Sequence, residues 1–142
     1  MSVVVTVPEL EAFLAREFPQ AFGPGRPHSV VSLGPRMATV RLEAGEEQLR
    51  PGGTISGPAM MGLADVAVYV ALLGQIGLVP LAVTTNLSIN FLRKPPPGEL
   101  FADARIIKLG KRLAVGDVGL RGAEGADLVA HCVATYSIPD RA

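Results

Sequence analysis

Asp65 is the residue in this sequence whose position most clearly suggests chemistry. It stands in a long apolar segment, and no basic residue lies three or four positions away on either side. On a helix those positions could form a salt bridge with it, so no local ion pair explains the carboxylate. An unpaired buried carboxylate costs free energy, and such a group either faces a polar partner elsewhere in the fold or takes part in a reaction. Both interpretations stay open at this point.

The start of the same segment offers a second feature, a set of free backbone N–H groups. Ser56 suits the N-cap of a helix and Pro58 its first turn, and Gly57 lies between them. Backbone N–H groups at a helix start can hold a developing oxyanion, and a glycine lets a ligand approach closely. An ordinary capped helix start is the alternative interpretation.

The spacing of these two groups has a consequence for assembly. Gly57 and Asp65 are eight positions apart, which corresponds to about 12 Å along one helix. A reacting carbonyl needs both groups within about 3 Å, so one helix cannot easily supply both. In a two-fold dimer, the Gly57 end of one antiparallel helix can meet Asp65 of the other. If both groups are catalytic, the sequence predicts at least a dimer with paired sites between subunits.

The segment that carries both groups predicts one long helix at Ala59–Ile76, with Gly77 as its C-terminal cap. It is apolar nearly all round, which is typical of a helix buried on most sides. Hydrophobic periodicity predicts a shorter amphipathic helix at about residues 8–18. Alternating and apolar runs predict strands at His28–Leu33, Met37–Ala44, Val83–Arg93, Leu100–Leu109, Leu113–Arg121 and Leu128–Ile138.

The order of these elements predicts an α+β fold, with a single domain over residues 1–142. The last four strands follow one another through short connections, so we expect an antiparallel meander. The sheet must curl around the long helix in order to cover most of its sides. Within Val83–Arg93, strict alternation places Thr84 and Asn86 on one face and the apolar side chains on the other.

Composition limits the class of protein. The 142 residues carry no formal net charge, and 49% of them are hydrophobic and 18% charged. These values exclude a disordered chain and lack the basic excess of a nucleic-acid-binding protein. A chain of this size with so large a hydrophobic fraction favours a buried interface between subunits.

The single cysteine, Cys132, allows no internal disulfide and fits none of the usual zinc spacings. We expect it to be a small buried side chain in a strand rather than a nucleophile. The first residues lack the basic region of a secretory signal, and the longest apolar stretch is marginal for a membrane span. We therefore expect a cytoplasmic protein with neither a membrane nor a nucleic acid as partner.

Residues 56–65, SGPAMMGLAD, resemble the signature of hotdog-fold acyl-CoA thioesterases of the phenylacetate-degradation (PaaI) type. That signature reads His-Gly-Gly, six residues and Asp. Residues 84–93 resemble the strand that follows the helix in this family, residues 110–114 its turn and residues 128–131 its last strand. The resemblance implies the hotdog fold, an antiparallel sheet wrapped around one long central helix. It also implies hydrolysis of a small or medium acyl-CoA, with neither a metal nor a cofactor.

The resemblance implies roles for particular residues. Asp65 would act as a general base on water or as a nucleophile, the backbone N–H of Gly57 would hold the oxyanion, and Thr84 would help to orient the nucleophilic water. The sequence departs from the family at Ser56, which replaces the motif His, and at Pro58, which replaces the second Gly and has no N–H.

Further contacts with the substrate are expected around this site. Arg50 stands where the family has a polar residue near the thioester, and Asn86 and Met61 are weaker candidates alongside Ser56. The phosphates of coenzyme A could contact basic residues at strand ends and turns, although each could equally be a solvated side chain: Arg93, Lys94, Lys108, Lys111 and Arg112.

The expected partners are an acyl-CoA and further copies of the chain, in a homodimer or a dimer of dimers. Loss of the motif His favours a second hypothesis, a non-catalytic protein that binds acyl-CoA or another acyl ligand. A hotdog hydratase or dehydratase is a third. Such enzymes usually need a His together with a carboxylate, and no His lies near Asp65 in the sequence.

Overall fold

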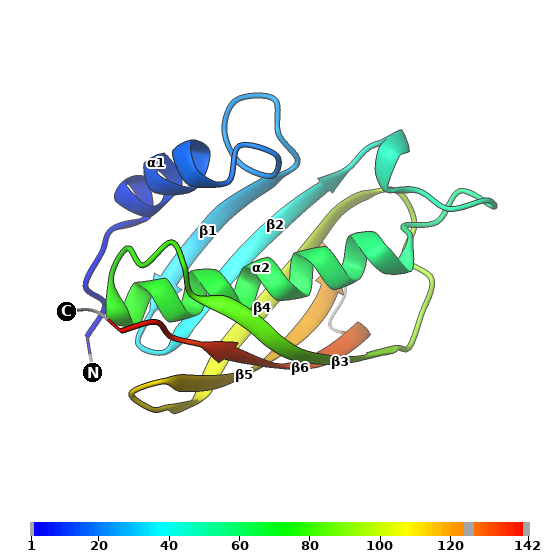
Figure 1. Cartoon of the computed structure of the whole chain (residues 1–142). Coiled ribbons are helices and arrows are strands. Elements are labelled where there is room, and N and C mark those ends of the chain that lie inside the picture. The colour runs from blue at the N-terminus through cyan, green and yellow to red at the C-terminus, as the bar shows by residue number, and fades with distance from the viewer. Residues whose placement is uncertain (1, 124–126, 141–142) are drawn as a thin grey trace.

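The computed structural model describes residues 2–123 and 127–140 as a curved sheet and two helices (Figure 1). The elements in chain order are α1 (Val7–Glu17), β1 (His28–Gly34), β2 (Met37–Ala44), a short 3-10 helix (Glu46–Gln48), α2 (Gly57–Ile76), β3 (Val83–Phe91), β4 (Gly98–Leu109), β5 (Leu113–Gly122) and β6 (Leu128–Ser137). The α+β class predicted from the sequence is confirmed.

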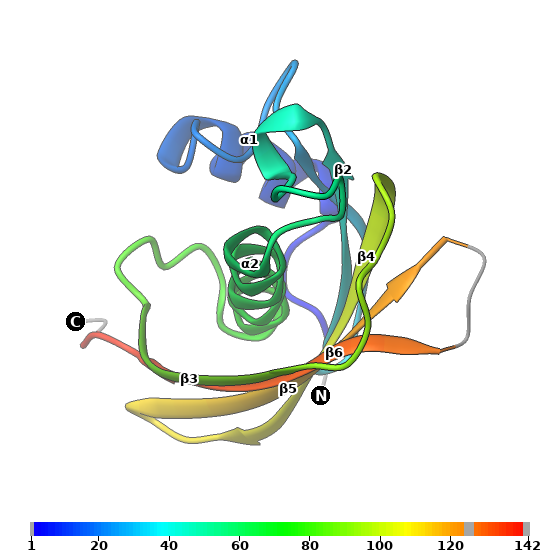
Figure 2. The ribbon, with the colours of Figure 1, turned by 90° about the vertical axis from the view of Figure 1, so that its right-hand side faces the viewer.

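Helix α2 lies inside the curve of the sheet, which passes around two of its sides (Figure 2). Its start is capped as predicted, because the Ser56 hydroxyl accepts a hydrogen bond from the Ala59 N–H at 3.2 Å. Its end is set by Gly77, whose φ of 95° favours glycine. By length and composition α2 could cross a membrane, but 72% of its most apolar window is buried within the fold. It is therefore the core helix of this domain.

The order of the strands differs from the expected meander. The sheet has six strands in the order β1-β2-β4-β5-β6-β3, all antiparallel. Of the last four strands, only β4, β5 and β6 follow one another as neighbours, while β3 pairs with β6 and β4 pairs with β2. The connection from β3 to β4 contains Pro95, Pro96 and Pro97, which have no N–H and cannot form a tight hairpin ladder. This connection instead carries the chain past β6 and β5 to β4, which pairs with β2, and β3 remains at an edge of the sheet.

The predicted strict alternation of β3 is also wrong. The register passes from Thr84 paired with Tyr136 to Asn86 paired with Thr135, which leaves Thr85 as the extra residue of a β-bulge. Thr84 before the bulge and Leu87 after it therefore both face α2. Asn86, which strict alternation placed beside Thr84, is exposed on the opposite face of the sheet.

Helix α1 packs beside β1 (Figure 1). A capping box between Thr6 and Glu9 fixes its start. Its buried residues, Leu10, Phe13 and Leu14, pack on the core, and Glu11 accepts a hydrogen bond from the Val30 N–H. The end of α1 is thereby held close to α2.

His28 predicts how stability depends on pH. Its ring lies 5.8 Å from that of Phe22, and both ring nitrogens are buried without a hydrogen-bond partner among the described residues. Burial lowers the pKa of His28 below its ordinary value of 6.5. The unfolded chain therefore takes up the proton at a higher pH than the folded chain does. The stability that neutral His28 supports is complete above about pH 6.5 and is lost as the pH falls toward the folded-state pKa.

We expect the melting temperature to fall between about pH 7 and pH 5, and to fall less in His28→Phe. Phenylalanine keeps a ring beside Phe22 but takes up no proton. Thermal unfolding followed by circular dichroism across this range measures the difference. An equal fall in both proteins would show that His28 does not contribute.

Candidate active site

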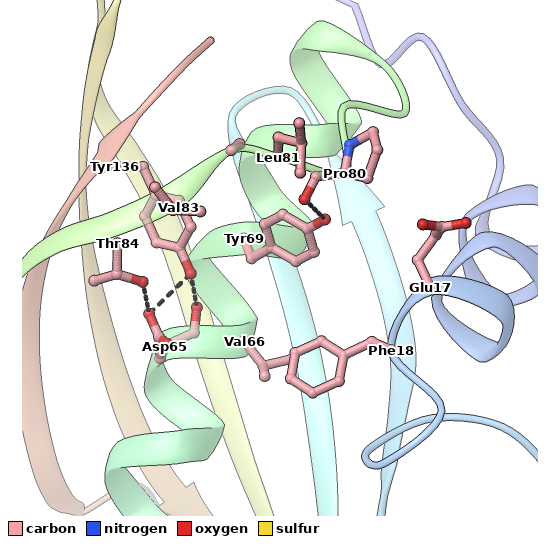
Figure 3. Close-up of a pocket in the computed structure, with 11 residues that line it drawn as sticks. Glu17, Phe18, Asp65, Val66, Tyr69, Pro80, Leu81, Val83, Thr84 and Tyr136 are labelled. Carbon is pink, nitrogen blue, oxygen red and sulfur yellow. Dashed lines mark hydrogen bonds between the residues drawn. The ribbon is translucent and has the colours of Figure 1, made fainter.

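The carboxylate of Asp65 points from α2 toward β3 and β6, where two hydroxyl groups meet it (Figure 3). The Thr84 hydroxyl donates to Oδ1 at 2.6 Å, and the Tyr136 hydroxyl lies 2.8 Å from the same oxygen. The Tyr136 hydroxyl also lies 2.9 Å from the backbone carbonyl oxygen of Asp65. Within the described residues no basic side chain forms a salt bridge with Asp65, so its partners are neutral donors.

Asp65 lines a cavity of about 470 Å³ between α2, the end of α1 and the start of β3 (Figure 3). Phe18 and Glu17 form the α1 side of this cavity. The rings of Tyr69 and Tyr136 are stacked, with centroids 6.0 Å apart, and the Tyr69 hydroxyl donates to the Pro80 carbonyl oxygen at 3.2 Å. The remaining lining is mostly apolar: Val66, Pro80, Leu81, Ala82, Val83 and Thr84.

Burial and the Asp65 charge act on the titratable groups around the carboxylate. Burial, and after it the negative charge of Asp65, raise the pKa of Tyr136 far above its usual value, so its hydroxyl keeps its proton. The same two causes raise the pKa of the Cys132 thiol to about 11. Cys132 is buried in β6, as the sequence predicts, and it is not an activated thiol. Within the described residues, no three His, Cys, Asp or Glu side chains are grouped as metal ligands would be.

The predicted oxyanion donor, Gly57, lies at the start of α2, near the end of β3 that is distant from Asp65. At the start of α2 the Ala59 and Met60 N–H groups bond to Ser56, and Pro58 has no N–H. Gly57 is thus the position whose N–H remains free at this helix start within the described residues. It lines a second cavity of about 380 Å³, together with Arg50, Thr54, Ile55, Met60, Phe91, Leu92, Arg93 and Lys94.

Asp65 and Gly57 therefore belong to two different cavities of one chain. This agrees with the predicted separation along the helix. Strand β3 extends from the first cavity to the second, since Val83 at its start lines the first and Phe91 at its end lines the second. A single chain does not bring the two groups together.

The other predicted contacts divide into two groups. Arg50, Arg93 and Lys94 lie beside Gly57 in the second cavity. The Ser56 hydroxyl is engaged in the helix cap. Met61 is 41% exposed and lines neither cavity.

Like Met61, the predicted contacts Asn86, Lys108, Lys111 and Arg112 line neither cavity of the chain. Asn86 is on the outer face of β3, because of the bulge. Lys111 and Arg112 form the exposed turn between β4 and β5, and Arg112 pairs with Asp140 at 3.4 Å. The turn and the bulge direct these side chains away from both cavities of one chain, and their contact with the substrate stays a prediction.

Tyr136 is the site residue that sequence reasoning missed. Alternation in β6 places it on the same face as the small or apolar residues Ala134 and Cys132, which indicated an inward side chain. Its contact with Asp65 depends on the pairing of β6 with β3, which the expected meander did not include.

A curved antiparallel sheet wrapped around one long helix is the hotdog fold. The family model described as the thioesterase superfamily matches residues 52–129. This is more than half of the chain, and the chain belongs to the thioesterase superfamily. The predicted hotdog fold and the PaaI-like resemblance are confirmed.

Solved structures support the same assignment. A candidate thioesterase from Silicibacter sp. TM1040 is 45% identical, with a TM-score of 0.88 over 99% of this chain and 96% of that one. A mutant of the phenylacetic acid degradation protein PaaI from Thermus thermophilus is 26% identical, with a TM-score of 0.70 over 80% and 94% of the two chains. Zebrafish thioesterase superfamily member 2, 20% identical, shares the fold with a TM-score of 0.81 over 95% and 99%. No curated protein matches the sequence.

Proposed function

We propose that this protein hydrolyses small or medium acyl-CoA thioesters to the free acid and CoA, in the cytoplasm. The observation that carries the proposal is the Asp65 carboxylate, held by two hydroxyl groups at the wall of a mostly apolar cavity. The acyl group lies in this cavity, and Asp65 activates a water molecule or attacks the thioester carbonyl itself. The CoA thiolate is a good leaving group.

The geometry of β3 supports a site shared by two subunits. This strand is at the edge of the sheet, and a second copy could pair with it in antiparallel fashion about a two-fold axis. Val83 lies at the Asp65 end of β3 and Phe91 at the Gly57 end. Antiparallel pairing of two β3 strands would therefore bring the Gly57 cavity of one subunit to the Asp65 cavity of the other. A dimer of dimers would leave these shared sites unchanged.

The combined site supplies each group that the reaction needs. The free N–H of Gly57 holds the oxyanion that forms when the thioester carbonyl is attacked. The basic side chains of the second cavity, Arg50, Arg93 and Lys94, lie where they would contact the phosphates of CoA. Asp65 and the oxyanion donor then lie on opposite sides of the reacting carbon.

The test of the function is thiol release from a panel of acyl-CoAs of different chain length and ring content. Each acyl group is also supplied as its N-acetylcysteamine thioester, which lacks the phosphates. We expect turnover of at least one acyl-CoA, with a lower KM than that of its short thioester. Tight binding of acyl-CoA without turnover would instead select a non-catalytic binding protein. Serine at position 56 favours that second function, because a hydroxyl that caps the helix has neither the reach nor the basicity of the motif His.

Mixed dimers test whether the site is shared. One subunit carries Asp65→Asn and the other carries Gly57→Pro with Pro58→Gly, which moves the free N–H by one residue. In a shared arrangement, each heterodimer retains one site in which both groups are intact. Random mixing of equal amounts should then restore about a quarter of wild-type activity, although each variant alone has very little. If each site lay within one subunit, mixing would restore nothing.

A further inference from the structure

Two hydroxyl groups converge on one oxygen of the Asp65 carboxylate. Thr84 and Tyr136 are directly opposite each other in the ladder between β3 and β6, so their side chains lie on the same face of the sheet. Their hydroxyls lie 2.6 Å and 2.8 Å from Oδ1. The bulge at Thr85 keeps this pair facing α2, whereas the next pair, Asn86 and Thr135, faces outward.

The second carboxylate oxygen has a different environment. Oδ2 accepts no hydrogen bond from the described residues, and Asp65 is part of the cavity wall. Rotation of the carboxylate about its Cβ–Cγ bond would break both contacts to Oδ1 at once. The arrangement therefore holds one oxygen of a cavity-lining carboxylate and leaves the other without a hydrogen bond from the described residues.

We infer that Tyr136 is a positioning residue for the hydrolysis: with Thr84 it holds Oδ1 of Asp65, so that Oδ2 is the oxygen that reacts. This inference rests on the proposed thioesterase function. In the base route, a water proton moves to Oδ2 while the water oxygen bonds to the thioester carbon. In the nucleophile route, Oδ2 itself bonds to that carbon. In both routes the C–S bond then breaks and its electron pair leaves with sulfur. In the nucleophile route, water then hydrolyses the anhydride between the acyl group and Asp65, which releases the acid and restores the carboxylate.

The surroundings of Tyr136 suit a fixed donor. Its raised pKa means that the hydroxyl stays protonated and acts as a donor rather than as a base. Its ring is stacked on that of Tyr69, with centroids 6.0 Å apart. The hydroxyl also reaches the backbone carbonyl oxygen of Asp65, so it is tied to the helix as well as to the carboxylate. A preorganised donor of this kind costs no rearrangement during the reaction.

Tyr136→Phe tests the inference, since it keeps the stacked ring and removes only the hydroxyl. We expect kcat to fall roughly ten-fold or more with little change in KM. Thr84→Val, which removes the other donor to Oδ1, should also lower kcat with little change in KM. The melting temperature of each variant is measured at the pH of its kinetics.

Tyr69→Phe is the matched comparison, because it removes a hydroxyl from the same cavity that contacts Pro80 instead of Asp65. Whatever it does to KM, it should lower kcat much less than Tyr136→Phe does. If Tyr136→Phe lowers only the melting temperature and keeps the wild-type kcat, Tyr136 is a packing residue and the inference is wrong.

A measurement without substrate separates this inference from the proposed function. The chain has two tyrosines, so labelling with [13Cζ]tyrosine gives two resonances. We expect the Tyr136 resonance to differ between the wild type and Asp65→Asn at the same pH, because its hydroxyl then contacts a neutral amide oxygen instead of a carboxylate. The Tyr69 resonance should not differ in this way. If neither resonance responds to Asp65, the contact is absent and the inference fails, even in an active thioesterase.

Discussion

Asp65→Asn should lose most of the thioesterase activity while keeping the fold. Asparagine has nearly the same shape, and its side-chain oxygen can still accept from Thr84 and Tyr136, which contact Oδ1. It cannot take up a proton from water or act as a carboxylate nucleophile. Loss of a group of this kind lowers the rate by roughly 10²–10⁴-fold. Thiol release from the best acyl-CoA of the panel measures the effect.

The control for this substitution is Asp140→Asn, an exposed carboxylate that pairs with Arg112 and lines neither cavity. It should retain full activity. Circular dichroism and the melting temperature should show that Asp65→Asn is folded. A rate for Asp65→Asn close to that of the wild type would refute the mechanism, because no other carboxylate of the described chain meets these hydroxyl donors.

Exchange of two neighbouring residues, Gly57→Pro with Pro58→Gly, should lower kcat by roughly 10²–10³-fold. Only the backbone N–H of residue 57 is free at this helix start, and proline has none. Proline is well tolerated at the first position of a helix, where no helical hydrogen bond is lost. A Cβ at position 57 would lie 3.4 Å from the Phe91 ring, which is an ordinary contact.

Gly57→Pro has to be combined with Pro58→Gly, because otherwise a second proline would directly follow the new one. A proline disfavours helical backbone in a preceding residue that carries a Cβ, so Gly57→Pro alone would strain the helix start. Pro58→Gly alone is the matched control and should keep its activity, since the Gly57 N–H remains. If the double variant is as active as this control, the Gly57 N–H does not hold the oxyanion.

The helices and most strands could be predicted because their signals are local. Ser56 and Gly77 set the ends of α2 through capping and positive φ, and the apolar surface of the segment required burial. The bounds of β2 matched at both ends, and the other strands matched within two residues at each end. Each of these outcomes follows from residues that are close together in the chain.

Strand pairing could not be predicted in the same way, because it joins residues distant in the sequence. The expected meander placed β3 next to β4, but β3 pairs with β6. The bulge at Thr85 has no signature in the alternating sequence, and it moved Asn86 away from Thr84. The contact of Tyr136 with Asp65 joins residues that are 71 positions apart and depends on that same pairing.

The sequence by itself determined that Asp65 is a lone carboxylate on a buried helix and that Gly57 is too distant along that helix to act with it in one chain. Both conclusions follow from helix geometry and from the cost of burying a charge. Only the tertiary structure decided what stabilises the carboxylate. Sheet pairing brings Thr84 and Tyr136 to a single oxygen, and the edge position of β3 leaves the two cavities at opposite ends of one strand. Such contacts depend on how distant segments pack, which no local pattern specifies.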